Sequence, residues 1–444
     1  MIVHELELNQ FRGFQKAALE FVPGFNLLVG ENGAGKSTVL WALRVALSHI
    51  LHKTSLSKQS ELEFLESDVA NSAAIEWPFL TATLEFNLSQ NDSTRSMFFA
   101  QRNRRQYVTG EAGKPREQVV ETPDRYEFVK YDLFRNLQST KPPRVLSGPR
   151  PLAVYYSANR SLVNEKPLSK SRTLGNEARA YAEALLERPS KLSDMADLWR
   201  KEDVLREEGV PDRANQAIQK ALPEFLEGFN NLRLDEKRGP QLTVDKEGAR
   251  LNLTQISDGE RSLLTMLMDL TRRLALANPG LKNPALEASA VVLIDEIDLH
   301  LHPRWQRTIV KKLTRTFPKC QFIATTHSPQ VIGEVPSGEI IVLEYGKPPY
   351  RPTQSLGMDS NWVLRFVMDS DERNLDVDRR LKRIATWIEK GKYEQAKKAI
   401  DALRSKIGEF PGLVQLQTRI DKRLFLSRPA PSKRSKGKKR SSSR

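Results

Sequence analysis

The sequence contains a single cysteine, Cys320, among 444 residues. One thiol cannot form a disulfide within the chain, which excludes the disulfide framework of small secreted proteins. The sequence also lacks any run of 18 apolar residues, the length that a helix needs to cross a membrane. Its first six residues include no lysine or arginine, whereas a signal peptide begins with a positively charged region. These absences predict a cytoplasmic protein with no membrane partner.

Acidic residues are missing from the end of the chain. The whole sequence carries 70 basic and 55 acidic residues, a net charge of +15. Residues 427–444 (SRPAPSKRSKGKKRSSSR) hold eight of the basic residues and no acid, so the remainder carries a net charge of only +7. This low-complexity tail is predicted to be disordered. Two roles for this tail stay open: it could bind DNA or RNA electrostatically, or it could only keep the protein in solution.

The most informative stretch is residues 30–38, GENGAGKST, which contains the pattern G-x-x-x-x-G-K-S. The apolar run 25–29 before it is typical of a strand, and residues 39–43 after it are typical of a helix. In this context the glycines let backbone N–H groups turn toward a phosphate, and the helix N-terminus adds positive charge. We therefore expect ATP binding, with Lys36 on the β and γ phosphates and Ser37 on Mg²⁺. The predicted ATP-binding residues are Gly30, Glu31, Asn32, Gly33, Ala34, Gly35, Lys36, Ser37 and Thr38.

A second strand-like run, residues 291–294, ends in two acids, Asp295 and Glu296. Four consecutive apolar residues are typical of a buried parallel strand, whose carboxyl end reaches the ligand site in α/β proteins. We expect Asp295 to bind Mg²⁺ through water and Glu296 to polarise the attacking water. Together with the phosphate loop, this pair predicts an ATPase.

Two further motifs predict contacts with a phosphate or another anion. Residues 257–260 (SDGE) read as a helix start, with Ser257 as N-cap and Glu260 three positions later. The N-terminal amides of that helix, with Ser257 and Gly259, could bind an anion. Another strand-like run, residues 322–326, is followed by His327, which could donate a hydrogen bond to a phosphate.

In this order, the motifs resemble those of the SMC/RecF/Rad50 branch of ABC-type ATPases. The N-terminal segment 9–14 (NQFRGF) resembles the turn in which that branch places a basic residue near the phosphates, and Arg12 is the matching position. The resemblance implies an α/β head with a mixed sheet and flanking helices, together with a helical lobe. It also implies a head-to-tail dimer or higher oligomer, in which Ser257 and Gly259 bind the γ-phosphate of ATP on the other protomer. His327 would be the switch histidine.

The sequence departs from the pattern of this branch at two places. Asp258 replaces a glycine of the usual signature, which brings a carboxylate near the phosphates and predicts slow or conditional hydrolysis. After the apolar run 152–156 the branch has a glutamine, whereas here Asn159 or Arg160 would replace it. Residues 297–303 resemble the D-loop of the branch; we interpret His300 and His302 in it as loop contacts rather than metal ligands.

The motifs and composition divide the chain into five expected segments. Residues 1–160 form an N-terminal ATPase lobe with the phosphate loop and antiparallel strands, and 161–250 form the helical lobe. Residues 251–350 form a C-terminal ATPase lobe with the signature, the acid pair and the switch histidine. Residues 351–426 form a helical partner-docking region, and 427–444 form the disordered tail.

The region after the ATPase bears most directly on biological function. A Toprim nuclease would need an apolar strand ending in an acid such as Glu344, followed by a D-x-D such as Asp376 and Asp378. Polar residues precede Asp376, so we favour helices instead, over 360–368, 375–389, 393–407 and 411–426. This block resembles the C-terminal region of the PtuA family, the ATPases of Septu anti-phage systems. The resemblance implies a separate HNH nuclease partner, similar to PtuB.

Our leading hypothesis is therefore an ATP-dependent regulatory subunit of an anti-phage complex. Two alternatives stay open: a RecF-like DNA-repair ATPase that acts as an ATP-gated clamp, and an OLD-like nuclease that needs no partner.

Overall fold

The computed structural model describes residues 1–54, 61–63, 65–68, 79–89, 92–101, 108–109, 115–116, 125–129, 150–158, 176–187, 213–235, 241–370 and 374–426. The predictions for Asn159, Arg160 and the basic tail lie outside these residues. The chain divides into two compact units, Met1–Met368 and Asp369–Arg444. In the described part of the chain, no helix combines the length and the apolar character needed to cross a bilayer.

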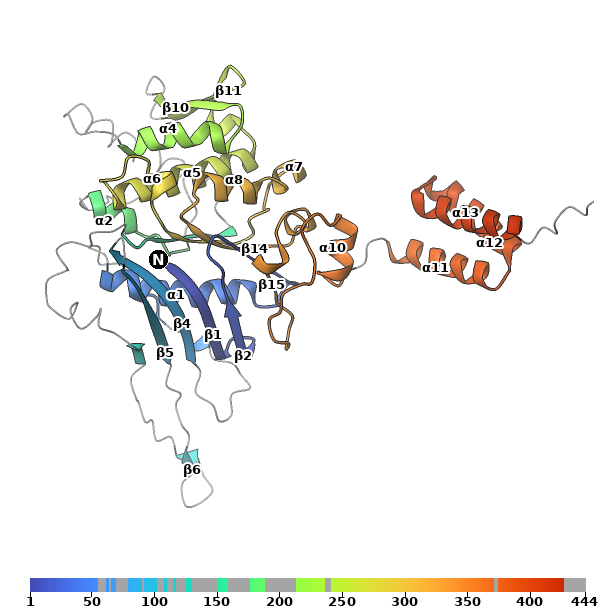
Figure 1. Ribbon diagram of the computed structural model, residues 1–444, viewed down its shortest axis with the longest axis horizontal. Helices are drawn as coiled ribbons and strands as arrows, with labels where there is room; N and C mark the ends of the chain where they lie inside the picture. Colours follow the sequence, from blue (N-terminus) through green and yellow to red (C-terminus); the bar gives the residue numbers. More distant parts are fainter. Residues whose placement is uncertain are drawn as a thin grey trace, which may run out of the picture. The chain divides into compact units, whose positions relative to one another are not determined.

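The first unit is built around a five-stranded parallel sheet in the order β15-β3-β14-β13-β9 (Figure 1). Every residue of these strands is buried, which explains why they appear in the sequence as continuous apolar runs. Because the strands are parallel, their carboxyl ends lie at one edge of the sheet. The strands are β3 (Phe25–Val29), β9 (Ala153–Tyr156), β13 (Val291–Ile294), β14 (Gln321–Thr326) and β15 (Ile340–Val342).

A second sheet is antiparallel, in the order β2-β1-β4-β5-β8. Helix α1 (Lys36–Thr54) contacts strands of both sheets, so it is apolar around most of its circumference. β5 begins at Asp92, which pairs with Ser89 of β4 in the hairpin. The strands are β1 (Ile2–Phe11), β2 (Phe14–Glu20), β4 (Phe79–Ser89), β5 (Asp92–Gln101) and β8 (Arg125–Val129); β6 (Val108–Thr109) and β7 (Pro115–Arg116) form a separate pair.

Helices pack together on the other side of the parallel sheet from α1 (Figure 1). Helix α5 (Asp258–Ala277) is the central one and contacts three neighbours. A buried network ties it to β9: the Tyr156 hydroxyl donates to Asp269 at 3.0 Å, and Arg273 Nε donates to the same carboxylate at 2.8 Å. The other helices of this layer are α2 (Asn176–Tyr181), α4 (Arg213–Phe225), α6 (Pro284–Glu287) and α8 (Ile309–Thr316).

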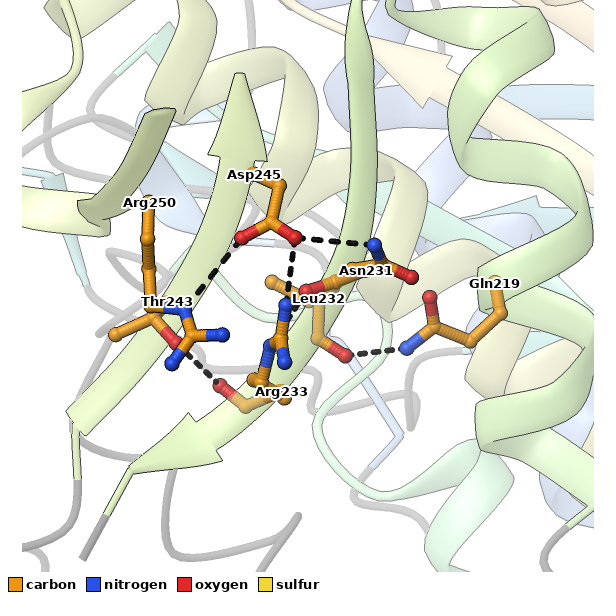
Figure 2. Close-up of polar contacts among 7 residues, drawn as sticks. All are labelled: Gln219, Asn231, Leu232, Arg233, Thr243, Asp245 and Arg250. Carbon is orange, nitrogen blue, oxygen red and sulfur yellow. Dashed lines mark hydrogen bonds and ion pairs between the residues drawn. The ribbon is translucent and has the colours of Figure 1, made fainter. Parts of the chain in front are cut away.

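Three antiparallel strands follow α4, where the sequence analysis expected a purely helical lobe up to residue 250. They are β10 (Phe229–Asp235), β11 (Gln241–Lys246) and β12 (Ala249–Asn252). Figure 2 shows how polar contacts hold them: Asp245 accepts hydrogen bonds from Asn231 and Arg233 and pairs with Arg250, while Gln219 of α4 donates to the Leu232 carbonyl. The expectation of a helical lobe was wrong for these strands, because antiparallel pairing overrides local propensity.

The boundary of the first unit also differs from the expected residue 350. Helix α10 (Ser360–Phe366) contacts α9, and its Val363 belongs to the main core. Tyr350 pairs with Val342 of β15 through two backbone hydrogen bonds. Residues 351–368 therefore belong to the ATPase unit rather than to a docking region. The short elements of this part are η1 (Glu66–Asp68), η3 (Leu253–Gln255), α7 (Pro303–Gln306), α9 (Pro329–Ile332) and η4 (Ser337–Glu339).

In its described part, residues 369–370 and 374–426, the second unit contains three helices with their own apolar core. They are α11 (Leu375–Glu389), α12 (Tyr393–Ile407) and α13 (Pro411–Leu426), with the bounds expected from the sequence. Their buried residues recur at helical spacing, such as Leu381, Ile384 and Ile388 in α11.

Candidate nucleotide-binding site

The phosphate loop leaves β3 and enters α1, as the sequence predicts. Gly33 and Gly35 have φ angles of +84° and +100°, a region that other residues rarely adopt. A Cβ atom at Gly35 would collide with the ring of Phe14 in β2, so no side chain fits between the loop and this strand. The loop is therefore held against the antiparallel sheet in a conformation that requires glycine.

Lys36 lies across the inside of this loop. Its Nζ donates hydrogen bonds to the carbonyls of Gly30 at 2.8 Å and Glu31 at 2.9 Å. Only 7% of the residue is exposed. Burial lowers the pKa of Lys36, although the carboxylates of Asp295 and Glu296 oppose this shift. A desolvated ammonium beside backbone N–H groups is the chemistry that a triphosphate requires.

The acid pair follows β13, directly beside β14 and one strand away from the phosphate loop. Ser37 Oγ lies 3.4 Å from Asp295 Oδ2. The other oxygen of Asp295 accepts a hydrogen bond from the Thr325 hydroxyl at 2.7 Å. A serine hydroxyl and a carboxylate at this separation fit a Mg²⁺ site, since magnesium prefers oxygen ligands and retains several waters.

Glu296 has a φ angle of +48°, in the left-handed region that is uncommon for residues other than glycine. Its backbone N–H donates to the Thr325 hydroxyl at 2.7 Å, which helps to hold this conformation. The chain turns sharply here, immediately after Asp295. Such local strain is characteristic of functional sites.

His327 follows β14 and is half-buried. Burial, aided by the nearby Lys36 ammonium, lowers the pKa of His327, against the opposing effect of Asp298 and the acid pair. The imidazole is therefore neutral at pH 7 and can donate one hydrogen bond. The expected residues of β3, β13 and β14 thus meet at one edge of the sheet.

The signature segment begins helix α5. Ser257 is the N-cap and forms a capping box with Glu260, whose carboxylate also accepts from Lys246 at 2.8 Å. Asp258 pairs with Arg261, so its carboxylate is already balanced by a cation. A Cβ atom at Gly259 would lie 2.5 Å from the carbonyl oxygen of His300. Only glycine fits against the D-loop at this position.

Arg12 lies in a turn with a φ angle of +49°. Its Nε donates to Asp68 at 2.7 Å and its backbone N–H donates to the Asp68 carbonyl at 2.7 Å. Asp68 is fully buried and also accepts from the Trp41 indole at 2.9 Å. The Arg12 guanidinium lies 5.5 Å from the centre of the Trp41 ring. Asp68 and Trp41 thus anchor Arg12, and its role at the phosphates stays a prediction.

The sequence predicts loop contacts for His300 and His302 rather than metal binding. In the described ranges, no group of three or more His, Cys, Asp or Glu side chains could hold a metal ion. His302 is the N-cap of α7, where its Nδ1 accepts from the Arg304 N–H at 3.3 Å. Its observed contact is a helix cap.

Residues 25–333 match the family described as "AAA domain, putative AbiEii toxin, Type IV TA system". That match spans most of the chain and includes the phosphate loop, the acid pair and His327. The chain belongs to this AAA family. It is an ABC-type ATPase, as the motif order predicts.

Several known proteins are similar to this chain in sequence. The retron Ec83 probable ATPase of Escherichia coli is 28% identical, over 95% of this chain and 87% of that protein. The retron Vc95 probable ATPase of Vibrio cholerae is 42% identical, over 30% of this chain and 25% of that protein. The Septu protein PtuA of Bacillus thuringiensis is 21% identical, over 77% of this chain and 76% of that protein.

Among solved structures, the chain is similar to an SMC head bound to the C-winged helix domain of ScpA, with 15% identity and a TM-score of 0.43. The match covers 80% of this chain and 99% of that one. A second similar structure is described as the recombination mediator protein RecF-ATPrS in the RecFOR pathway, with 15% identity and a TM-score of 0.41. The match covers 79% of this chain and 98% of that one.

Three residues near this site were not predicted from the sequence: Asp68, Thr325, and Gln306, whose side chain donates to the carbonyls of Asp298 and Leu301. Thr325 is fully buried inside a strand, where a threonine is unremarkable. Asp68 lies in a polar segment without periodicity, and Gln306 lies in a four-residue helix. Each acts through a partner distant in sequence, so no local pattern could have identified it.

Proposed function

We propose that this ATPase is the regulatory subunit of an anti-phage defence complex and that it controls a separate HNH nuclease. The ATP-dependent part of this proposal rests on one observation. Lys36, Ser37, Asp295 and Glu296 lie together at the carboxyl edge of the parallel sheet. The similarity to retron ATPases and to Septu PtuA supports the defence role.

Each residue of this edge has a proposed task. Residues 30–38 bind ATP, Lys36 neutralises the phosphates, and Ser37 with Asp295 holds Mg²⁺. Glu296 orients the attacking water, and neutral His327 donates a hydrogen bond at the γ-phosphate. The Mg²⁺ ion supplies charge neutralisation on the transferred phosphoryl group.

Ser257 and Gly259 are proposed to act in trans, on ATP bound to a second copy of the chain. Ser257 and Asp258 are exposed at the start of this 20-residue helix, whose N-terminal N–H groups and dipole favour an anion. The Asp258–Arg261 ion pair reduces the repulsion that Asp258 would otherwise exert. A head-to-tail dimer, or a multiple of it, follows from this arrangement.

Helices α11 to α13 are the proposed docking region for the nuclease. They form a unit with a core of its own, so they can bind a partner without disturbing the ATP site. Residues 375–426 carry thirteen basic and seven acidic residues, a net charge of +6, which favours an acidic partner surface.

An OLD-like nuclease within the chain is less well supported. Glu344 accepts hydrogen bonds from Lys347 and from the Tyr350 hydroxyl, which lower its pKa. Asp376 and Asp378 lie in the first turn of helix α11, not at the end of an apolar strand. The RecF-like clamp stays the alternative without a nuclease.

The test combines a point variant with a truncation. Lys36→Ala should abolish ATP binding in calorimetry, because it removes the cation from the phosphate loop. Cutting the chain after Met368 should preserve ATP binding but prevent co-purification with a co-expressed HNH subunit, together with phage resistance. Unchanged ATP affinity in Lys36→Ala would refute the site, whereas co-purification of the truncated chain would refute the docking region.

A further inference from the structure

The two neighbours of His327 both form hydrogen bonds toward the D-loop. The hydroxyl of Thr326, which is fully buried, donates to the carboxylate of Asp298. The hydroxyl of Ser328, which is 6% exposed, donates to Oε1 of Gln306 at 2.8 Å. The loop that carries the proposed γ-phosphate sensor is thus held on both sides of the histidine.

Gln306 completes the second of these links. Its Nε2 donates to the carbonyl oxygens of Leu301 at 2.9 Å and Asp298 at 3.4 Å. Gln306 ends helix α7, and its side chain folds back onto the segment that precedes that helix. A side-chain amide carries donors and an acceptor on adjacent atoms, so one residue can bridge a hydroxyl and two carbonyls.

The same D-loop also contacts the signature helix. His300 has a φ angle of +61°, and its carbonyl oxygen lies against Gly259 so closely that a Cβ atom there would be 2.5 Å away. That Cβ would also lie 3.5 Å from a methyl group of Leu301. Residues 298–301 therefore lie between the His327 loop and the start of α5.

We propose that Gln306 is a positioning residue that couples the His327 loop to the signature helix through the D-loop. The proposal rests on the proposed ATPase site, in which His327 senses the γ-phosphate and the signature serves the opposite protomer. A displacement of Ser328 moves the side chain of Gln306 through their hydrogen bond, and Gln306 in turn moves the carbonyls of Asp298 and Leu301. Loss of the phosphate at one site is thereby transmitted to the signature that acts on the other.

The kinetic test uses the full-length chain with Gln306→Met, which keeps the length and helix propensity of the side chain but removes its hydrogen bonds. The matched control is Gln330→Met. Gln330 bonds to Ser360 at 2.7 Å and to Arg307, and these bonds do not involve the D-loop. We expect Gln306→Met to lower kcat about tenfold, equivalent to about 1.4 kcal/mol, with KM unchanged within about twofold. Gln330→Met should retain the wild-type kcat.

A double-variant cycle tests whether Ser328 and Gln306 act through one bond. Ser328→Ala also removes the N-cap of α9, so it will lower thermal stability as well as kcat. Adding Gln306→Met to Ser328→Ala should lower kcat by less than about threefold more. Full additivity of the two losses would show that the residues act independently and would overturn the proposed link.

Hydrogen exchange provides a readout that does not depend on turnover. The Leu301 amide donates to the Asp298 carbonyl at 3.0 Å, within the segment that Gln306 holds. Gln306→Met should accelerate exchange in residues 298–302 about tenfold, and Gln330→Met should not. Equal exchange in both variants overturns the proposal, even if the wild-type chain does not hydrolyse ATP. Absent hydrolysis with the expected exchange would instead refute the proposed ATPase site.

Discussion

Thr325 offers the sharpest test of how the acid pair is held. Its hydroxyl donates to the Asp295 carboxylate and accepts from the Glu296 N–H, both at 2.7 Å, and the residue is fully buried. Thr325→Val keeps the shape of the side chain but removes one hydrogen-bond partner from the Asp295 carboxylate and one from the Glu296 N–H. The variant therefore perturbs both acids without removing either.

The expected loss of stability in Thr325→Val follows from these two hydrogen bonds. A hydrogen bond to a charged group contributes about 1.5–3 kcal/mol, and a neutral one about 0.5–1.5 kcal/mol. We expect Thr325→Val to lower the free energy of unfolding by about 2–4 kcal/mol. Because Asp295 and Glu296 also lose their orientation, kcat should fall at least about tenfold. Urea denaturation followed by circular dichroism, and ATPase rates at saturating ATP, measure the two effects.

Thr271→Val is the matched control. Thr271 is also fully buried, but among the described residues its hydroxyl has no hydrogen-bond partner. Thr271→Val should therefore lower the free energy of unfolding by less than about 1 kcal/mol and leave kcat unchanged. If the two variants have the same stability and the same kcat, the hydroxyl of Thr325 does not position the acid pair and the reasoning is refuted.

Three further predictions concern other groups of the unit. Glu296→Gln should bind ATP and stay dimeric, as size-exclusion chromatography would show, and wild-type turnover in this variant would exclude the role of Glu296 with water. Ser257→Arg should bind ATP but stay monomeric. Because the pKa of His327 is lowered on folding, the unfolded chain binds more protons as the pH falls below about 6.5, so stability decreases there. His327→Gln should reduce the loss of stability below about pH 6.5, as urea denaturation at several pH values would show. An unchanged dependence of stability on pH would contradict the lowered pKa of His327. Burial raises the pKa of Cys320 to about 12, so iodoacetamide should modify it only after unfolding, as mass spectrometry of native and denatured samples would reveal.

Much of this protein is determined locally by its sequence. The glycine and lysine spacing of residues 30–38 defines the phosphate loop, and buried parallel strands appear as apolar runs because both of their faces are covered. The bounds of α11, α12 and α13 also follow from local signals. Asn374 caps the first of these helices, Gly408 ends the second with a φ angle of +82°, and Pro411 begins the third.

Tertiary structure decided the features that depend on partners distant in the chain. Residues 229–235 form a strand only because β11 pairs with them, although the preceding segment is helical. Residues 351–368 join the ATPase unit because Val363 and Val367 enter its core. Asp68, Thr325 and Gln306 form hydrogen bonds with residues that lie 56, 30 and 22 positions away in the chain. These are the links Arg12–Asp68, Asp295–Thr325 and Gln306–Ser328. Sequence spacing identifies groups that lie on one loop or helix, whereas only folding brings together hydrogen-bond partners from different strands and loops.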